Sequence, residues 1–228
     1  MSGLHEAGVV GDSPIHRLDP RAKLLGLTAV TVIAVSTTAW PVHAACAAAL
    51  IAVAALARLT PRTVARRMRV VIPALMLVAA FIPFHAGAVF ALPKATLGTL
   101  SAVLLGATTP FPDILHALER LRAPRLLVLI AAFMYRYLFV IVDEVHRMRA
   151  ALVARGYAPR HALQVQAIGR VATALFLRTY ERAERVHLAM LARGFDQNMP
   201  RLDVLTFRRA DVLFLSALLV LLPIRLFA

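Results

Sequence analysis

The sequence has little cysteine, little lysine and few acidic residues, and each shortage excludes a kind of protein. Its one cysteine, Cys46, lies inside an apolar run, so a disulfide framework is excluded and redox chemistry is not expected. Lysine occurs only at Lys23 and Lys94, so the net charge of +14 comes almost entirely from arginine. The long apolar runs contain no aspartate or glutamate except Asp211, near the end of one of them. Paired carboxylates inside a membrane, as an enzyme or a proton relay would need, are therefore not expected.

Two motifs are also missing. The first 23 residues carry charges such as Glu6, Asp12 and Arg17 and have no apolar core. We therefore expect no cleavable signal peptide, with the first membrane span acting as the insertion signal. No G-x-x-x-x-G-K-[ST] phosphate-binding loop is present, because neither lysine stands in that context. We expect the chain to hold no cofactor or metal of its own and not to hydrolyse ATP.

What the sequence does contain is apolar residues. Of its 228 residues 60% are hydrophobic, and the mean hydropathy is +0.73. Soluble domains have about 45–50% apolar residues. The composition predicts an all-α polytopic membrane protein with about five transmembrane helices. The expected spans are Leu24–Ala39, His43–Ala57, Val70–Leu92, Ala95–Thr109 and Ala210–Phe227.

Turn and capping residues indicate where some of these helices start. Trp40-Pro41 is expected to form the outer turn between the first two spans. Asp19-Pro20 and Thr60-Pro61 each place a capping residue before a proline, so helices are expected to begin there. The fourth span is short for a hydrocarbon core of about 30 Å.

A sixth apolar stretch, Leu126–Val142, is expected not to cross the membrane. Arg136 lies at its middle, where a charge costs several kcal/mol. If the stretch stays at the interface, all 26 Lys and Arg except Lys94 and Arg225 lie on the cytoplasmic side. Positive charge collects on that side of membrane proteins, so the N-terminus is expected inside and nucleic acid need not be invoked.

The chain thus divides into three predicted parts. Residues 1–109 form the cytoplasmic N-terminus and four spans, 110–209 form a cytoplasmic region, and 210–228 form the last span. The cytoplasmic region is expected to contain a short amphipathic helix and two long ones, from spacing of its apolar residues. Their expected ranges are Pro112–Leu121, Leu126–Arg155 and His161–Arg193.

Both long helices are expected to end in the same pattern. The first ends with Ala154, Arg155 and Gly156, followed by a tyrosine, and the second ends with Ala192, Arg193 and Gly194, followed by a phenylalanine. Glycine suits the positive-φ position after a helix, and arginine in the last turn is favoured by the helix dipole. Ordinary helix capping explains one copy, whereas two copies suggest two similar plugs for two similar sockets. A dimeric or pseudo-dimeric partner follows.

These motifs resemble a known family, the CbiQ/EcfT family, which comprises the T components of energy-coupling factor ABC-type importers. The stretches Ser13-Pro-Ile-His-Arg-Leu-Asp-Pro-Arg-Ala-Lys23 and Thr109-Pro-Phe-Pro-Asp-Ile-Leu115 are also similar to it, as is Arg136 ahead of Glu144 and Arg147. The N-terminus looks most like the cobalt-dedicated CbiQ type. Nothing in the spacing or periodicity itself identifies cobalt.

The resemblance implies a function. Two long coupling helices would cross, and Arg155 and Arg193 would each dock in a groove of an ATPase subunit, where ATP is bound. A substrate-capture membrane subunit would complete the importer, which would carry cobalt or nickel across the bacterial inner membrane. Two other readings stay open on the residues alone: a stand-alone permease, and a membrane scaffold without an ATPase partner.

Overall fold

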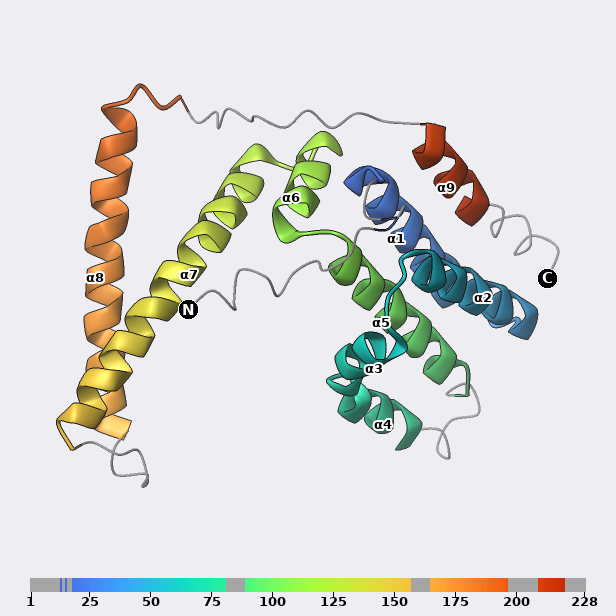
Figure 1. The fold of residues 1–228 in the computed structure, drawn as a ribbon, viewed down its shortest axis with the longest axis horizontal. Coiled ribbons are helices and arrows are strands. Elements are labelled where there is room, and N and C mark those ends of the chain that lie inside the picture. The colour runs from blue at the N-terminus through green and yellow to red at the C-terminus, as the bar shows by residue number, and fades with distance from the viewer. Residues whose placement is uncertain are drawn as a thin grey trace. The chain divides into compact units, whose positions relative to one another are not determined.

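The computed structural model describes residues 13, 15, 18–80, 89–156, 165–196 and 209–219, with the side chains of 165–167 and 219 left out. Over these residues the regular structure is helical, without strands, which confirms the all-α prediction. Figure 1 shows the helices. They are α1 (Pro20–Ser36), α2 (Trp40–Leu56), α3 (Pro61–Arg69), α4 (Ile72–Ala80), α5 (Ala91–Thr108), α6 (Phe111–Arg120), α7 (Arg125–Ala154), α8 (Val165–Leu191) and α9 (Arg209–Leu219).

The chain forms two compact units. Unit 1 comprises Met1–Pro124 together with Val204–Ala228, and unit 2 comprises Arg125–Asp203. Unit 2 is therefore an insertion in unit 1, which the chain leaves after α6 and re-enters before α9. The three-part division predicted from the sequence places its boundaries elsewhere, at residues 110 and 210, and remains a prediction.

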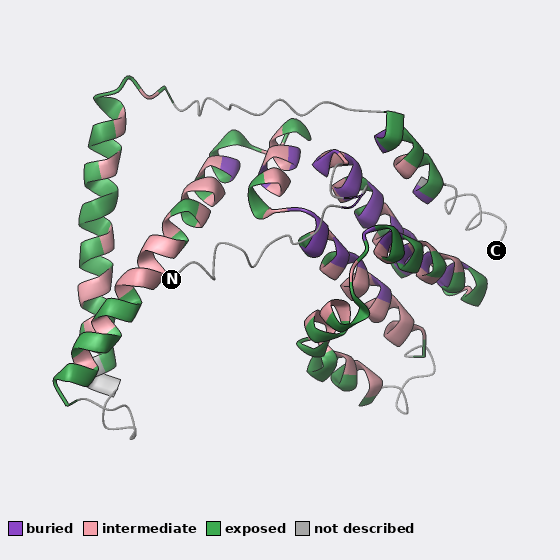
Figure 2. Cartoon of the chain, viewed as in Figure 1, coloured by how far each residue is buried: buried purple, intermediate pink, exposed green. Residues whose placement is uncertain are grey.

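Helix α1 is the centre of unit 1 and packs against α2, α5, α6 and α9. It begins as predicted at Asp19-Pro20, where the Asp19 side chain accepts a hydrogen bond from the backbone N–H of Arg21. Figure 2 shows buried positions along α1 and on α2 and α5. Buried apolar side chains from these helices and from α9 make the core, including Leu27, Val30, Ile33, Val42, Cys46, Leu50, Leu97, Leu104 and Leu218.

The surface of unit 1 is unusually apolar. Val32, Ile51, Met76 and Leu213 are all between 62% and 69% exposed, and they come from four different helices. A monomeric soluble protein rarely exposes so many large apolar side chains. Lipid contact accounts for them, in agreement with the composition.

The structure differs from the sequence predictions at Trp40-Pro41 and at the cap of α3. Trp40-Pro41 is not the turn between the first two spans, as predicted, because both residues belong to the first turn of α2 and the connection is Thr37–Ala39. Proline fits there because the first helical residues have no intrahelical acceptor for their N–H groups. Thr60 does precede α3, but its hydroxyl contacts the hydroxyl of Thr63 instead of capping the backbone.

The number of spans stays a prediction. The predicted third span, Val70–Leu92, contains the apolar helix α4 and the first two residues of α5, and residues 81–88 between these helices lie outside the described residues. Within the described residues α7 is the one helix that is both long and apolar enough to cross a membrane, judged by length and composition. This helix contains Leu126–Val142, the stretch predicted to stay at the interface. That prediction rests on the exposed Arg136 in the middle of the stretch, because a charge at the bilayer centre is costly. Helix length and overall composition take no account of where the charge lies.

Candidate docking site

The two long helices of unit 2 are joined by charged side chains. Glu144 of α7 lies 2.6 Å from Arg147 on the same helix and 2.6 Å from Arg178 of α8. Hydrogen bonds from Arg147, then from Arg178, lower the pKa of the Glu144 carboxyl. On α8 itself, Glu181 and Arg185, one turn apart, form a further ion pair at 3.7 Å. Glu144 thus fixes the point at which α7 and α8 meet.

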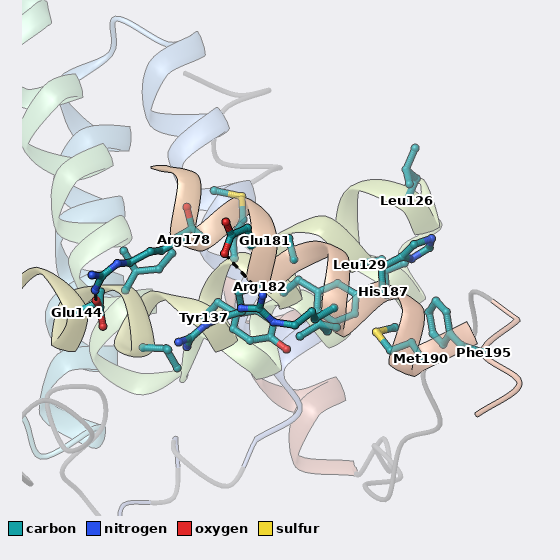
Figure 3. A pocket seen from close by; sticks show the side chains of 18 of the residues that line it. Leu126, Leu129, Tyr137, Glu144, Arg178, Glu181, Arg182, His187, Met190 and Phe195 are labelled. Carbon is teal, nitrogen blue, oxygen red and sulfur yellow. Dashed lines mark hydrogen bonds and ion pairs between the residues drawn. The ribbon is translucent and has the colours of Figure 1, made fainter. Parts of the chain in front are cut away.

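The helices run in roughly opposite directions, because α7 approaches the start of α8 near its own C-terminal end, while the start of α7 and the end of α8 lie apart (Figure 1). Leu126 and Leu129 of α7 line the same cavity as Met190 and Phe195 at the end of α8 (Figure 3). Helices of 30 and 27 residues are each about 40–45 Å long. Their C-termini therefore lie at opposite ends of unit 2.

The end of α7 has the predicted geometry. Gly156 has a φ of 78°, which residues with a side chain rarely adopt. Its N–H donates to the carbonyl of Val153 at 3.0 Å, and the N–H of Arg155 is shared between the carbonyls of Ala151 and Leu152. These bonds satisfy carbonyl groups that the end of a helix would leave open.

The end of α8 has the same geometry and shows one more bond. Gly194 has a φ of 75° and donates to the carbonyl of Leu191 at 2.9 Å. The N–H of Phe195 donates to the carbonyl of Met190 at 3.1 Å. Together the two bonds form a Schellman motif, in which the residue after the glycine folds back over the last turn. In the first copy that residue, Tyr157, lies outside the described residues.

The six motif residues are all exposed: Ala154, Arg155, Gly156, Ala192, Arg193 and Gly194. Among the described residues neither Arg155 nor Arg193 has an ion-pair partner. A Cβ built on either glycine meets nothing within 4 Å. Each motif is thus a slim helix end with an exposed guanidinium, and such a group can be bound by hydrogen bonds and a carboxylate of another protein.

The cavity between α7 and α8 could not be predicted from the sequence. It has a volume of about 880 Å³ and is lined on the α7 side mainly by apolar residues, among them Phe133 and Tyr137. The α8 side contributes charged residues, including Arg182 and Arg185. Figure 3 shows side chains from both helices turned toward this space. Periodicity can identify the faces of each helix, but not which faces are paired.

The fold and these helix ends define an all-helical protein with an apolar surface and two matched, exposed helix ends. Comparison with known proteins agrees, because a family model described as CbiQ, cobalt transport protein, matches residues 11–202. The chain belongs to the CbiQ family. The family resemblance found in the motifs is therefore confirmed.

Three relatives illustrate the match. A cobalt transport protein CbiQ of Rhodobacter capsulatus is 35% identical over 42% of this chain and 39% of its own length. An energy-coupling factor transporter transmembrane protein EcfT of Leuconostoc gelidum is 26% identical over 92% of this chain and 91% of its own. A putative ABC transporter ATP-binding protein of Bifidobacterium longum is 28% identical over 91% of this chain and 31% of its own. This chain thus spans less than half the length of several curated relatives, including the protein of Rhodobacter capsulatus.

Proposed function

We propose that this protein is the transmembrane coupling subunit of an energy-coupling factor ABC-type importer. It would transmit conformational change from ATPase subunits to a substrate-capture membrane subunit. The observation that carries the proposal is the pair of matching helix ends on α7 and α8, each with an exposed arginine before a positive-φ glycine. Two equal contact points on one unit fit two copies, or two similar copies, of one partner.

Arg155 and Arg193 are the proposed anchors of that contact. A guanidinium that enters a groove can be paired with a carboxylate, which gives a strong and directional contact. The alanines Ala154 and Ala192 keep each helix end narrow, and the glycines turn the chain away from the partner. Because both anchors belong to one unit, binding of the first raises the effective concentration of the second.

The partner is proposed to be a pair of ATPase subunits, which bind ATP while this chain remains non-catalytic. The relative of Bifidobacterium longum supports this choice, because it is named as an ATP-binding protein and about a third of it matches nearly all of this chain. A protein of that kind joins in one polypeptide what we propose to be two interacting subunits here.

Cobalt, or nickel, is the proposed substrate of the complete importer. This choice of substrate rests on the description of the family and on the similarity to the cobalt transport protein of Rhodobacter capsulatus. The importer would lie in the bacterial inner membrane with the N-terminus of this chain in the cytoplasm, since that orientation obeys the charge distribution.

Co-purification tests the proposal. The protein is extracted in a mild detergent from its own cells, and the retained proteins are identified by mass spectrometry. We expect an ATPase and a second, small membrane protein to be retained with this chain in a constant ratio from one preparation to the next. Recovery of the chain alone from cells that contain such an ATPase would favour the permease reading, and recovery with other membrane proteins but no ATPase would favour the scaffold.

A further inference from the structure

Charged residues are buried together at one end of unit 1. Lys23 of α1 is only 2% exposed, and its Nζ donates a hydrogen bond to the carbonyl oxygen of Thr108, the last residue of α5, at 3.1 Å. Asp211 of α9 is 1% exposed, and its Oδ1 accepts a hydrogen bond from the backbone N–H of Asp19 at 2.7 Å. Burial lowers the pKa of the Lys23 ammonium to about 8, and the negative charges of Asp113 of α6, Asp19 and Asp211 act against that shift. We call Lys23, Asp19 and Asp211, which are buried, together with Asp113, which is half-buried, the charge cluster.

The cluster lies where the chain leaves unit 1 and where it returns. Helix α6, which carries Asp113, ends at Arg120 shortly before unit 2 begins at Arg125. Helix α9, which carries Asp211 in its first turn, begins at Arg209 shortly after unit 2 ends at Asp203. Both covalent paths between the units therefore reach helices that pack against α1. Helix α9 is bonded to the start of α1 through Asp211, and α6 begins three residues after Thr108, the hydrogen-bond partner of Lys23.

Stability does not explain such a cluster well. Burying charges costs several kcal/mol for each ion, and well-packed apolar residues in their place are often as stable or more so. Keeping a charged lysine close to the membrane costs additional free energy. What a buried charged contact provides is one defined arrangement of the elements that carry the charges, here α1, α5, α6 and α9.

We propose that Lys23 is a positioning residue of the transport cycle, which holds α6 and the start of α9 to α1 so that unit 1 follows displacements of unit 2. This inference rests on the proposed function, because ATPase subunits must move unit 2 for the contact to matter. Arg155 and Arg193 attach the ATPase subunits to unit 2. Lys23 keeps α6 and α9, the helices next to the two connections between the units, attached to the rest of unit 1. Its loss should uncouple ATP hydrolysis from uptake without releasing the ATPase.

The test compares four variants in the assembled transporter. Lys23→Met removes the charge at similar length, and Lys23→Arg keeps a charge and so protects folding. Lys94→Met is the matched control, because Lys94 is the other lysine and lies outside the cluster. The double variant Lys23→Met with Asp113→Asn also removes the carboxylate that Lys23→Met leaves without its strongest partner, which should restore stability lost by that route.

Three quantities are measured on each variant: the amount of ATPase retained, the rate of ATP hydrolysis, and uptake of radioactive cobalt and nickel. We expect Lys23→Met to keep retention and hydrolysis within about twofold while uptake falls about tenfold or more, whereas Lys94→Met matches the parent. Lys23→Arg should restore uptake in part. The double variant should recover protein level but not uptake.

A readout without substrate keeps the inference separate from the choice of metal. A thiol is introduced into α9 as Ser216→Cys, at an exposed position, in a Cys46→Ala background. We expect ATP to change its rate of labelling in the parent complex and not with Lys23→Met.

The inference is overturned by uptake that follows protein level in every variant, by an equal labelling change with and without Lys23, or by no change in the parent. Failure of all three Lys23 variants to accumulate would assign the cluster to folding and overturn it too. Absence of a bound ATPase from the unsubstituted protein would instead contradict the proposed function.

Discussion

Replacing Gly156 or Gly194 by valine should weaken binding of the ATPase far more than replacing it by alanine. Both glycines have φ values of 75–78°, a region that costs a residue with a Cβ about 1–2 kcal/mol. A β-branched side chain resists it more strongly, and strained positions of this kind reach about 3 kcal/mol. Neither site has an atom within 4 Å of a built Cβ, so the cost is conformational and not a steric clash.

The exposed helix end can avoid this cost by unwinding, which would release the arginine before the glycine from its defined position. If binding must restore the native turn, the cost appears as lost affinity. About 1 kcal/mol for alanine corresponds to roughly fivefold, and about 2–3 kcal/mol for valine corresponds to roughly 30-fold to 150-fold. The affinity of each purified variant for the ATPase, measured by titration with free ATPase, shows the difference between alanine and valine.

Gly169 provides the matched control. It lies inside α8, has no positive φ and has free space around a built Cβ. Alanine there should stabilise the helix by about 0.5–1 kcal/mol and leave ATPase binding unchanged. Equal tolerance of alanine and valine at both Gly156 and Gly194 would refute the argument that the positive-φ turn presents the arginine.

Two other predictions concern unit 1 and the topology. Gly26 lets α9 approach α1, since a built Cβ would lie 2.7 Å from Leu218 Cδ1 and 3.0 Å from Phe214 Cε1; Gly26→Leu should therefore cost about 1–3 kcal/mol of stability, seen as a lower melting temperature. Gly98→Ala, whose Cβ would meet only Thr31 at 3.5 Å, should have little effect, and equal melting temperatures for the two variants would exclude a close contact of α1 with α9. For the topology, single cysteines in a Cys46-free protein should react with an impermeant reagent in intact cells at positions 94 and 228 and stay unlabelled at 4 and 160. Strong labelling at position 160 would contradict the assignment of the region 110–209 to the cytoplasm.

The parts of the fold that could be predicted are those encoded by neighbouring residues. Asp19-Pro20 starts a helix because the cap and the proline act within one turn. The two glycines mark helix ends because the positive φ is a local requirement. The predicted ranges of α6, α7 and α8 accordingly agree with the structure to within a few residues.

What the sequence could not show depends on residues far apart. Lys23 contacts the carbonyl of Thr108, 85 positions away, and Asp19 contacts Asp211, 192 positions away. From the sequence alone Lys23 was one more charge on the cytoplasmic side of the first span. The cross-helix pair of Glu144 and Arg178 could not be predicted for the same reason, whereas the pair of Glu144 and Arg147 lies within one turn of a single helix.

The central claim is that Arg155 and Arg193 attach two ATPase subunits, and charge reversal at both tests it most directly. Loss of one partner from a buried charged contact costs about 2–5 kcal/mol, which is roughly 30-fold to several-thousandfold in affinity. Arg155→Glu or Arg193→Glu alone should weaken ATPase retention and uptake, because the other contact remains. The double variant should release the ATPase and abolish uptake while still entering the membrane, with Arg170→Glu on exposed α8 as a control for added negative charge. ATPase retained by the double variant at the level of the unsubstituted protein would contradict the docking role and leave the two motifs as helix caps.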